Sequence, residues 1–131
     1  MAKARQSQPS PKPVRWVGSS KEDLSAFPGD VRRRVGRALW DAQLGVKAPF
    51  AKPLKGFGSA GVLEVVDDFD GDTYRAAYTV RFAGIVYVLH AFEKKSRTGI
   101  ATPKSDLDLI KRRLARARED YEQWQDTQTS K

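Results

Sequence analysis

One segment in the second half of the chain combines residue types that can do chemistry: HAFEKKSRTGIATP, which runs from His90 to Pro103. It opens with the single histidine of the chain and continues into the cationic run Lys94-Lys95-Ser96-Arg97. An imidazole exchanges protons near neutral pH, and clustered cations bind phosphate groups. The segment therefore predicts an apolar strand that ends in a basic site, followed by a helix with Thr102 as its cap.

Two turn signals predict the strands that must position these residues. Asp70-Gly71 is a strong signal for a two-residue hairpin loop, and Ala83-Gly84 is a weaker one. The signals separate three apolar runs that are typical of strands, at about Val62–Phe69, Thr73–Phe82 and Ile85–Lys94. Two-residue loops determine the register of such strands, because Phe69 must then oppose Asp72 and Phe82 must oppose Ile85.

This register divides the three strands into two faces. One face is almost wholly apolar, and we expect helices to cover it: Leu63, Val65, Tyr74, Ala76, Tyr78, Val80, Phe82, Ile85, Tyr87, Leu89 and Ala91. The other face mixes polar and apolar side chains. We expect that mixed face to remain open to solvent.

The mixed face brings several charged groups together. Glu64, Ala77 and His90 form one row across the three strands. Arg75, in the next row, is a diagonal neighbour of Glu64 and His90 at roughly 7–8 Å. Lys94-Lys95 follows at the end of the same sheet, so we expect a basic site with acid–base groups. The alternatives are an ion pair between Glu64 and Arg75, a histidine that only packs, and a solvated strand end.

The remaining segments predict one more strand, three helices and a loop. Val14–Val17 is typical of a short strand, and Ser19–Phe27, Asp30–Gly45 and the segment after Pro103 place apolar residues at helical spacing. Phe50–Ala60 is rich in Gly, Pro and Lys and is predicted to be a loop. The order β-α-α-β-β-β-α predicts an α+β fold, with two N-terminal helices and one C-terminal helix on one face of a small antiparallel sheet.

Length and composition narrow the class of protein. The chain has 131 residues, a formal net charge of +8 and a sequence pI of about 9.9. We expect one domain at residues 14–125, a disordered basic Pro-rich tail at 1–13 and a frayed tail at 126–131. The positive charge favours a polyanionic partner such as RNA or the ribosome. Cysteine is missing and long apolar runs are missing, so we expect no disulfide, no membrane contact and a cytoplasmic protein.

Two stretches of the chain carry a family pattern. The first, from Tyr74 to Ala117, reads YRAAYTVRFAGIVYVLHAFEKKSRTGIATPKSDLDLIKRRLARA, with a strand ending in H-x-F-x-K-K-S before a Thr-Pro pair and an amphipathic helix. The second, from Pro53 to Val65, reads PLKGFGSAGVLEV. Together they resemble the phage-derived Gp49-like branch of the HigB and RelE toxin superfamily. The likeness extends from Val14 to about Trp124.

The resemblance implies a toxin of a type II toxin–antitoxin pair with a RelE-like fold. Such a toxin is an endoribonuclease that cleaves messenger RNA in the ribosomal decoding site. The expected partners are a helix-turn-helix antitoxin, messenger RNA and the ribosome, and the toxin is expected to be a monomer within a hetero-oligomeric complex. The resemblance places the active-site arginine at Arg75, the basic strand end at Lys94 and Lys95, and the glutamate of the first hairpin strand at Glu64.

We expect this chemistry to need no metal or other cofactor, because RNA carries its own nucleophile, the 2′-hydroxyl. In this hypothesis Arg75, Lys94 and Lys95 stabilise the charge that develops on the phosphate. The general base is either His90 or Glu64. Further RNA contacts are expected from cations outside this centre: Lys55, Arg81, Arg97 and Lys104.

One position departs from the family pattern. Many relatives carry an arginine where this chain has Val66, so that phosphate-binding group is either missing here or replaced by Arg81 or Arg97. Two other functions stay open at this point. The first is a non-catalytic RNA- or ribosome-binding module, and the second is an inactive toxin whose main contact is its antitoxin.

Overall fold

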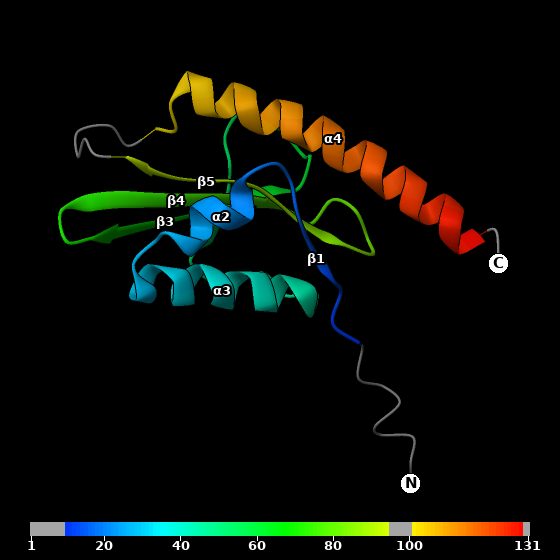
Figure 1. The fold of residues 1–131 in the computed structure, drawn as a ribbon, viewed down its shortest axis with the longest axis horizontal. Helices are drawn as coiled ribbons and strands as arrows, with labels where there is room; N and C mark the ends of the chain where they lie inside the picture. Colours follow the sequence, from blue (N-terminus) through cyan, green and yellow to red (C-terminus); the bar gives the residue numbers. More distant parts are fainter. Residues whose placement is uncertain (1–9, 95–100, 130–131) are drawn as a thin grey trace, which may run out of the picture.

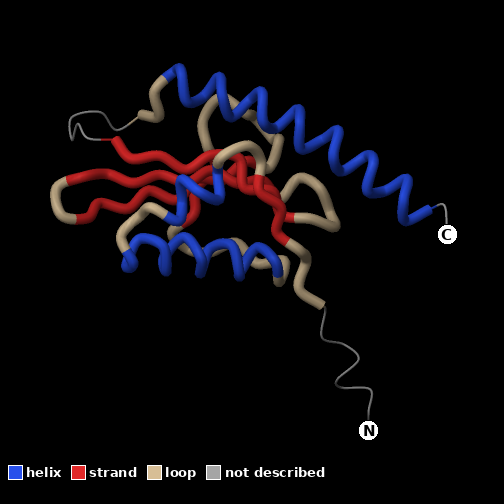
Figure 2. The backbone as a smooth tube through the Cα atoms, in the orientation of Figure 1, coloured by secondary structure: helices blue, strands red, loops and turns tan. Residues whose placement is uncertain are grey.

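The computed structural model describes residues 10–94 and 101–129 (Figures 1 and 2). Its elements are β1 (Val14–Trp16), α2 (Ser20–Ser25), α3 (Gly29–Gln43), β2 (Ala51–Pro53), β3 (Val62–Phe69), β4 (Asp72–Thr79), β5 (Val86–Lys94) and α4 (Lys104–Thr129). The predicted order is confirmed with one addition, β2, which lies in the segment predicted to be a loop. Two predicted site residues, Lys95 and Arg97, lie outside the described residues.

The strands form one five-stranded sheet in the order β1-β5-β4-β3-β2. From β2 to β5 each strand pairs antiparallel with the next, but β1 pairs parallel with β5, with Val14 opposite Val86. The prediction of an antiparallel sheet is therefore confirmed for β2 to β5 and wrong for β1. A parallel pairing requires a long connection, which α2, α3 and the three intervening strands provide.

The turn at Asp70-Gly71 confirms the first predicted register. Asp70 has a φ of 52° and Gly71 a φ of 89°, and a type I′ hairpin turn requires positive φ at both positions. Phe69 pairs with Asp72 as predicted. The local sequence is therefore enough to align β3 with β4.

The connection between β4 and β5 differs from the prediction. β4 ends at Thr79 and β5 begins at Val86, so Ala83-Gly84 is not the two-residue loop of a hairpin. The Thr79 hydroxyl donates to the Gly61 carbonyl at 3.0 Å and accepts from the Arg81 amide at 3.1 Å. These bonds hold the chain after Thr79 beside Gly61, where it leaves the β4–β5 ladder.

A β-bulge in β5 restores the predicted register farther along. Ala77 pairs with His90, but Tyr78 pairs with Val88, so Leu89 is the extra residue. Because this single insertion offsets the longer connection, Ala77 faces His90 as predicted. The register is shifted by one residue on the other side of the bulge.

Helices cover both faces of the sheet (Figure 1). On one face α2 and α3 pack over a cluster of buried strand residues: Leu63, Val65, Ala76, Tyr78, Val86 and Val88. On the other face α4 packs through Ile110 and Ala117, both fully buried, over a second cluster: Val62, Ala77, Phe82, Ile85, Tyr87 and Leu89. The predictions that all helices share one face and that the mixed face stays open are therefore wrong.

The shifted register explains why the second face is apolar enough to bind a helix. Tyr87 and Leu89 were predicted on the same face as Leu63, but they lie in the cluster under α4. Two successive residues on a bulged strand oppose one partner, so Leu89 joins His90 on the side of Ala77. The apolar stripe of α4 therefore has apolar strand residues to bury itself against.

Both ends of the described chain are attached to the fold or continue one of its elements. Lys12 exchanges hydrogen bonds with Gln43 at 2.9 and 2.7 Å, and the carbonyl of Pro13 accepts from the Val86 amide at 3.0 Å. At the other end α4 continues through Thr129. None of the helices in the described ranges combines the length and the apolar composition that crossing a bilayer requires.

A polar cluster ties the N-terminal strand to α4. Asp120 of α4 accepts hydrogen bonds from Arg15 of β1 and from the Tyr87 hydroxyl of β5, both at 2.6 Å. Burial alone raises the pKa of the Asp120 carboxyl, but the hydrogen bonds from Tyr87 and Arg15 outweigh it and hold this pKa below its ordinary value. The carboxylate form of Asp120 therefore stabilises the fold.

Replacing Ile110 with alanine is expected to lower the free energy of unfolding by about 2–5 kcal/mol, because the change leaves a cavity between α4 and the sheet. Urea denaturation would measure this difference. The control is Val46→Ala, since Val46 is 57% exposed and its loss should change the free energy of unfolding by less than about 0.5 kcal/mol. Equal losses in both variants would contradict the packing of α4 described above.

Asp120→Asn is expected to lower the free energy of unfolding at pH 7, because asparagine cannot pair with the charge of Arg15. The pKa of Asp120 is depressed in the folded state, so its contribution is complete above the unfolded pKa of about 3.9 and is lost as the pH falls below it. The difference between wild type and variant should therefore be constant near neutral pH and shrink as the pH falls below about 3.9 in urea denaturation. Glu119→Gln, at an exposed neighbouring position, serves as control.

Candidate functional site

Arg75, Glu64 and Thr102 form a buried hydrogen-bond network. The Nη1 of Arg75 donates to Oε2 of Glu64 and to Oγ1 of Thr102, each at 3.2 Å. The Thr102 hydroxyl in turn donates to Oε2 of Glu64 at 2.6 Å. The side chain of Arg75 is only 4% exposed and that of Glu64 is 13% exposed. The structure therefore confirms the predicted proximity of Arg75 and Glu64, but it places the pair under α4.

The positions of these three residues follow from the sheet and from the start of α4. Val66 pairs with Arg75, and Glu64 pairs with Ala77, so Glu64 and Arg75 are diagonal neighbours on adjacent strands. Thr102 lies two residues before α4 begins. The prediction that Thr102 caps this helix is wrong, because its hydroxyl bonds to the Glu64 carboxylate instead. The network thus fastens the beginning of α4 to β3 and β4.

Glu64 and Thr102 also face an open pocket with a volume of about 330 Å³, the Glu64 pocket. Its other lining residues are Lys52, Pro53, Leu54, Lys55, Ala101 and Leu107. Both lysines are exposed. A carboxylate with a buried guanidinium behind it therefore shares one cavity with two ammonium groups and a hydroxyl. Such a set of groups can bind a phosphate and accept a proton next to it.

Lys52 is a site residue that the sequence analysis missed. It lies in β2, where it pairs directly with Glu64. The segment from Phe50 to Ala60 was predicted to be a loop, so it had no register that could place Lys52 opposite a strand residue. The alternation of Ala51, Lys52 and Pro53 is too short a signal to predict a strand.

His90 is on the predicted side of the sheet but outside the Glu64 pocket. Its Nε2 lies 2.7 Å from Oδ1 of Asp106 in α4, and its ring stacks on Phe92 with centroids 4.7 Å apart. His90 is 7% exposed and borders a different cavity, of about 320 Å³, together with Phe27 and Glu93. The structure therefore places His90 in a different cavity from Glu64 and gives it an acidic partner on α4.

Lys94 lies beside the Glu64 pocket. Its side chain is half-buried, and its Nζ donates a long hydrogen bond of 3.4 Å to the carbonyl of Ala101, which lines that pocket. The neighbouring predicted residues Lys95 and Arg97 lie outside the described ranges. Lys94 is thus the one member of the predicted cationic run whose position relative to the pocket is described.

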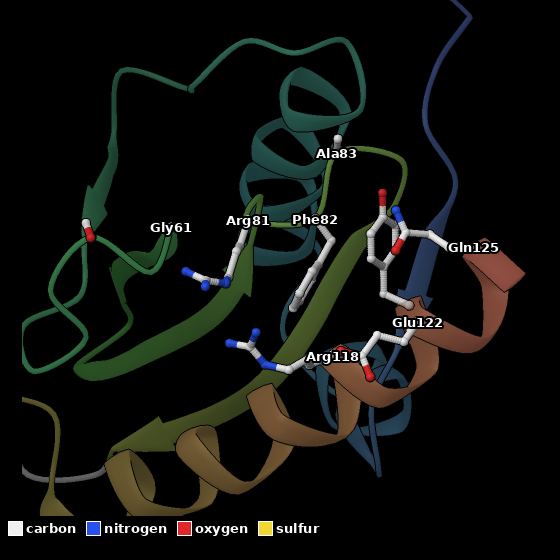
Figure 3. Close-up of a pocket in the computed structure, with 9 residues that line it drawn as sticks. Gly61, Arg81, Phe82, Ala83, Arg118, Glu122 and Gln125 are labelled. Atoms are coloured by element: carbon white, nitrogen blue, oxygen red, sulfur yellow. The ribbon is translucent and has the colours of Figure 1, made fainter.

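The other predicted RNA contacts lie at three separate places. Lys55 lines the Glu64 pocket. Lys104 is exposed in the first turn of α4, where its hydrogen bond to Asp108 at 3.0 Å holds the pKa of that carboxyl below its ordinary value. Arg81 lies in another pocket with Arg118, farther along α4 (Figure 3). The structure therefore joins only Lys55 to Glu64.

Comparison with known proteins gives a family match and similar folds. The family model described as "Phage derived protein Gp49-like (DUF891)" matches residues 22–115. One similar structure is that of an E. coli toxin RelE mutant in the free state, which is 13% identical in sequence with a TM-score of 0.50. The matched region covers 82% of this chain and 98% of the RelE chain. The toxin–antitoxin complex RelBE2 from Mycobacterium tuberculosis is 21% identical, with a TM-score of 0.42, and covers 66% of this chain and 94% of its own. A comparison with curated proteins found no match.

Similarity to RelE confirms the predicted α+β fold of the RelE type. The match covers nearly the full length of the RelE chain, so the likeness concerns the whole RelE fold rather than a fragment of it. At 13% identity the likeness concerns the fold alone. The chemistry of the Glu64 pocket must therefore be argued from the residues of this chain.

Thr102→Val is expected to lower the free energy of unfolding by about 1–3 kcal/mol, because it removes the hydroxyl that bonds both Arg75 and Glu64 and leaves the shape nearly unchanged. Urea denaturation at pH 7 measures the loss. Thr102→Ser retains the hydroxyl and is the matched control. If the valine and serine variants were equally stable, the network would have no part in holding α4.

Proposed function

The chain belongs to the phage-derived Gp49-like family, and from this premise we propose that it is the toxin of a type II toxin–antitoxin pair and cleaves messenger RNA. The observation that carries the proposal is the Glu64 pocket, where a carboxylate oriented by Arg75 and Thr102 shares a cavity with Lys52 and Lys55. These groups match what RNA cleavage by the 2′-hydroxyl requires. The RelE-like fold supports the same proposal.

Glu64 is the proposed general base, which answers the choice between Glu64 and His90. Both of its hydrogen bonds to Arg75 and Thr102 go to Oε2, and Oε1 accepts none from the described residues. Oε1 would take the proton from the 2′-hydroxyl, and the 2′-oxygen would attack the adjacent phosphorus. The 5′-oxygen then leaves and takes up a proton, which yields a 2′,3′-cyclic phosphate and a 5′-hydroxyl.

Lys52 and Lys55 are the proposed charge-stabilising groups for the phosphorane that forms in this step. Neither makes an ion pair with a carboxylate among residues 10–94 and 101–129, and both are exposed at the pocket. Lys94, next to Ala101, would add a third positive charge. Removing one such donor typically lowers the rate by about 10²–10³. Lys95 and Arg97 remain predicted contributors on sequence grounds.

Arg75 acts on this proposal as a positioning residue for Glu64. It is 3% exposed, so its guanidinium reaches the Glu64 carboxylate and Thr102 rather than the open cavity. His90 bonds to Asp106 and is 7% exposed, which favours a role in holding α4 against β5. With Arg75 and His90 in these supporting roles, the proposed reacting groups are Glu64, Lys52 and Lys55. They line the pocket beside β2, the strand at the edge of the sheet.

The proposed partners follow from the family and from charge. A net charge of +8 is complementary to RNA, and we infer that the protein acts on translated messenger RNA at the ribosome in the cytoplasm. A helix-turn-helix antitoxin is the proposed inhibitor, bound to one toxin monomer within a hetero-oligomer. A non-catalytic RNA-binding module is the second candidate function, favoured by the burial of Arg75 and His90.

Glu64→Gln is expected to lower the rate of reporter messenger RNA cleavage by about 10²–10⁴, because glutamine retains a hydrogen-bond acceptor for Arg75 but cannot take the proton. The assay compares purified proteins with and without translating ribosomes, and growth after expression gives a second readout.

Lys52→Ala is expected to lower the rate of cleavage in the same assay by about 10²–10³. Lys21→Ala, at an exposed position of α2, is the matched control and should cleave as wild type does.

Two outcomes would contradict the proposal. Cleavage by Glu64→Gln at the wild-type rate would remove Glu64 as the base. Tight binding of RNA by the wild type with no cleavage, on or off the ribosome, would favour the non-catalytic module instead.

A further inference from the structure

A second pocket lies along the C-terminal half of α4, and nothing in the proposed reaction uses it. It has a volume of about 600 Å³, within the range of ligand sites, and we name it the Arg81 pocket. Its lining includes Ser59, Gly61, Arg81, Phe82, Arg118 and Tyr121 (Figure 3). It shares no lining residue with the Glu64 pocket. The two cavities are therefore separate sites beside one helix.

Two guanidinium groups dominate the Arg81 pocket. Arg81 follows β4 and Arg118 lies on α4, and their guanidinium groups extend in the same direction from the two sides of the pocket (Figure 3). Both side chains are exposed. Within the described ranges neither forms an ion pair with a carboxylate. Two guanidinium groups on one pocket that form no ion pair with its single acidic lining residue, Glu122, can bind an anion, and guanidinium groups match phosphate oxygens in pairs.

The fold holds both arginines in place. The amide of Arg81 donates to the Thr79 hydroxyl, which donates to the carbonyl of Gly61, so the backbone of Arg81 is fastened to the strand opposite. Gly61 has a φ of +71°, and a side chain there would meet the Arg81 amide nitrogen at 3.2 Å. The Cζ of Arg118 lies 6.0 Å from the centroid of the Phe82 ring. Contacts with neighbouring residues therefore hold the backbone of Arg81 and the guanidinium of Arg118.

Two aromatic residues, Phe82 and Tyr121, also line the Arg81 pocket, and Phe82 is 7% exposed. Phe82 and Tyr121 have centroids 5.1 Å apart, and Tyr121 stacks on Trp124 at 5.4 Å. The Tyr121 hydroxyl accepts from the Gly84 amide at 3.2 Å, which holds the ring in place. Single-stranded RNA is bound by cations that contact its phosphates and by aromatic or guanidinium planes on which its bases stack.

The two pockets lie at different points along α4, and a lysine side chain lies between them. Leu107 lines the Glu64 pocket and Arg118 lines the Arg81 pocket, and the two lie about 16 Å apart along the helix. Lys111 lies between them on the same stripe, with its Nζ 6.0 Å from the Phe57 ring centroid. The loop with Lys55, Phe57 and Ser59 borders this path on its other side. An extended polyanion fits a track of this form.

We propose that the Arg81 pocket binds a phosphate and an adjacent base of the same RNA strand that is cleaved in the Glu64 pocket. The inference rests on the proposed function for the identity of the cleaved strand. Glu122 favours RNA over an acidic peptide, because it lies on the side of the pocket away from both guanidinium groups (Figure 3). There its carboxylate repels acidic side chains but accepts a hydrogen bond from the amino group of a base.

The test measures binding of two fluorescent 2′-O-methyl oligonucleotides, which cannot be cleaved, by fluorescence anisotropy. One has about 12 nucleotides and spans both pockets, and the other has about 4 and fills one. The Arg81→Gln/Arg118→Gln variant should bind the long probe about tenfold more weakly or worse, and the loss should be smaller for the short probe, which cannot occupy both pockets at once. The slope of log Kd against log salt concentration should become shallower by about 0.7, the change expected for one lost phosphate contact.

The control variant is Arg32→Gln/Arg37→Gln, which removes the same charge from exposed positions of α3 on the other side of the sheet and should retain long-probe affinity. Equal affinity of both double variants for the long probe would overturn the inference. So would a selective loss of binding to a poly-glutamate peptide with RNA affinity unchanged, since that result identifies an acidic protein partner. Reporter cleavage by the wild type tests the proposed function separately: its absence overturns that function, whereas arginine-dependent binding of the long probe still supports the pocket as an RNA site.

Discussion

The buried bonds among Arg75, Glu64 and Thr102 are the interaction on which the site depends. Arg75 is 3% exposed, so its guanidinium needs acceptors within the protein, and Glu64 and Thr102 provide them. Thr102 completes the network from the segment that leads into α4, and so the network determines where that helix begins over the sheet. The same bonds orient the Glu64 carboxylate at the edge of an open cavity. Stability and the proposed chemistry therefore share one set of hydrogen bonds.

The helix α4 connects every functional feature of the molecule. Its apolar stripe closes the second core, and its polar residues reach out on either side of that stripe. Asp106 bonds to His90, Leu107 lines the Glu64 pocket, Asp120 bonds to β1 and β5, and Arg118 completes the Arg81 pocket. A helix that covers a sheet face is usually considered structural. In this protein the packing of α4 also determines which side chains of the covered sheet face remain accessible. The Glu64 pocket is the accessible part of that face beside the edge strand β2.

Local signals account for the parts of the site that were predicted. The Asp70-Gly71 turn aligns β3 with β4, so the diagonal contact of Glu64 and Arg75 followed from residue types alone. The row of Ala77 and His90 was also predicted, although the assumed second turn was wrong, because the bulge at Leu89 offset the error. Lys52 was not predicted, since β2 has three residues and exists through its pairing with β3. Pairing between distant segments leaves little trace in so short a stretch of sequence.

The sequence by itself determined the order of the elements apart from β2, the family, the basic character of the chain and the side of the sheet on which Glu64, Arg75 and His90 lie. Only the tertiary structure decided whether that side is open, and which partner each group takes. Alternation along a strand states which side chains share a face, but it carries no information about the helix that later covers it. The bond between Glu64 and Thr102 joins residues 38 positions apart, and that between His90 and Asp106 joins a strand to a helix. Such contacts arise from packing, because a buried charge bonds to whichever polar group the folded chain brings within reach.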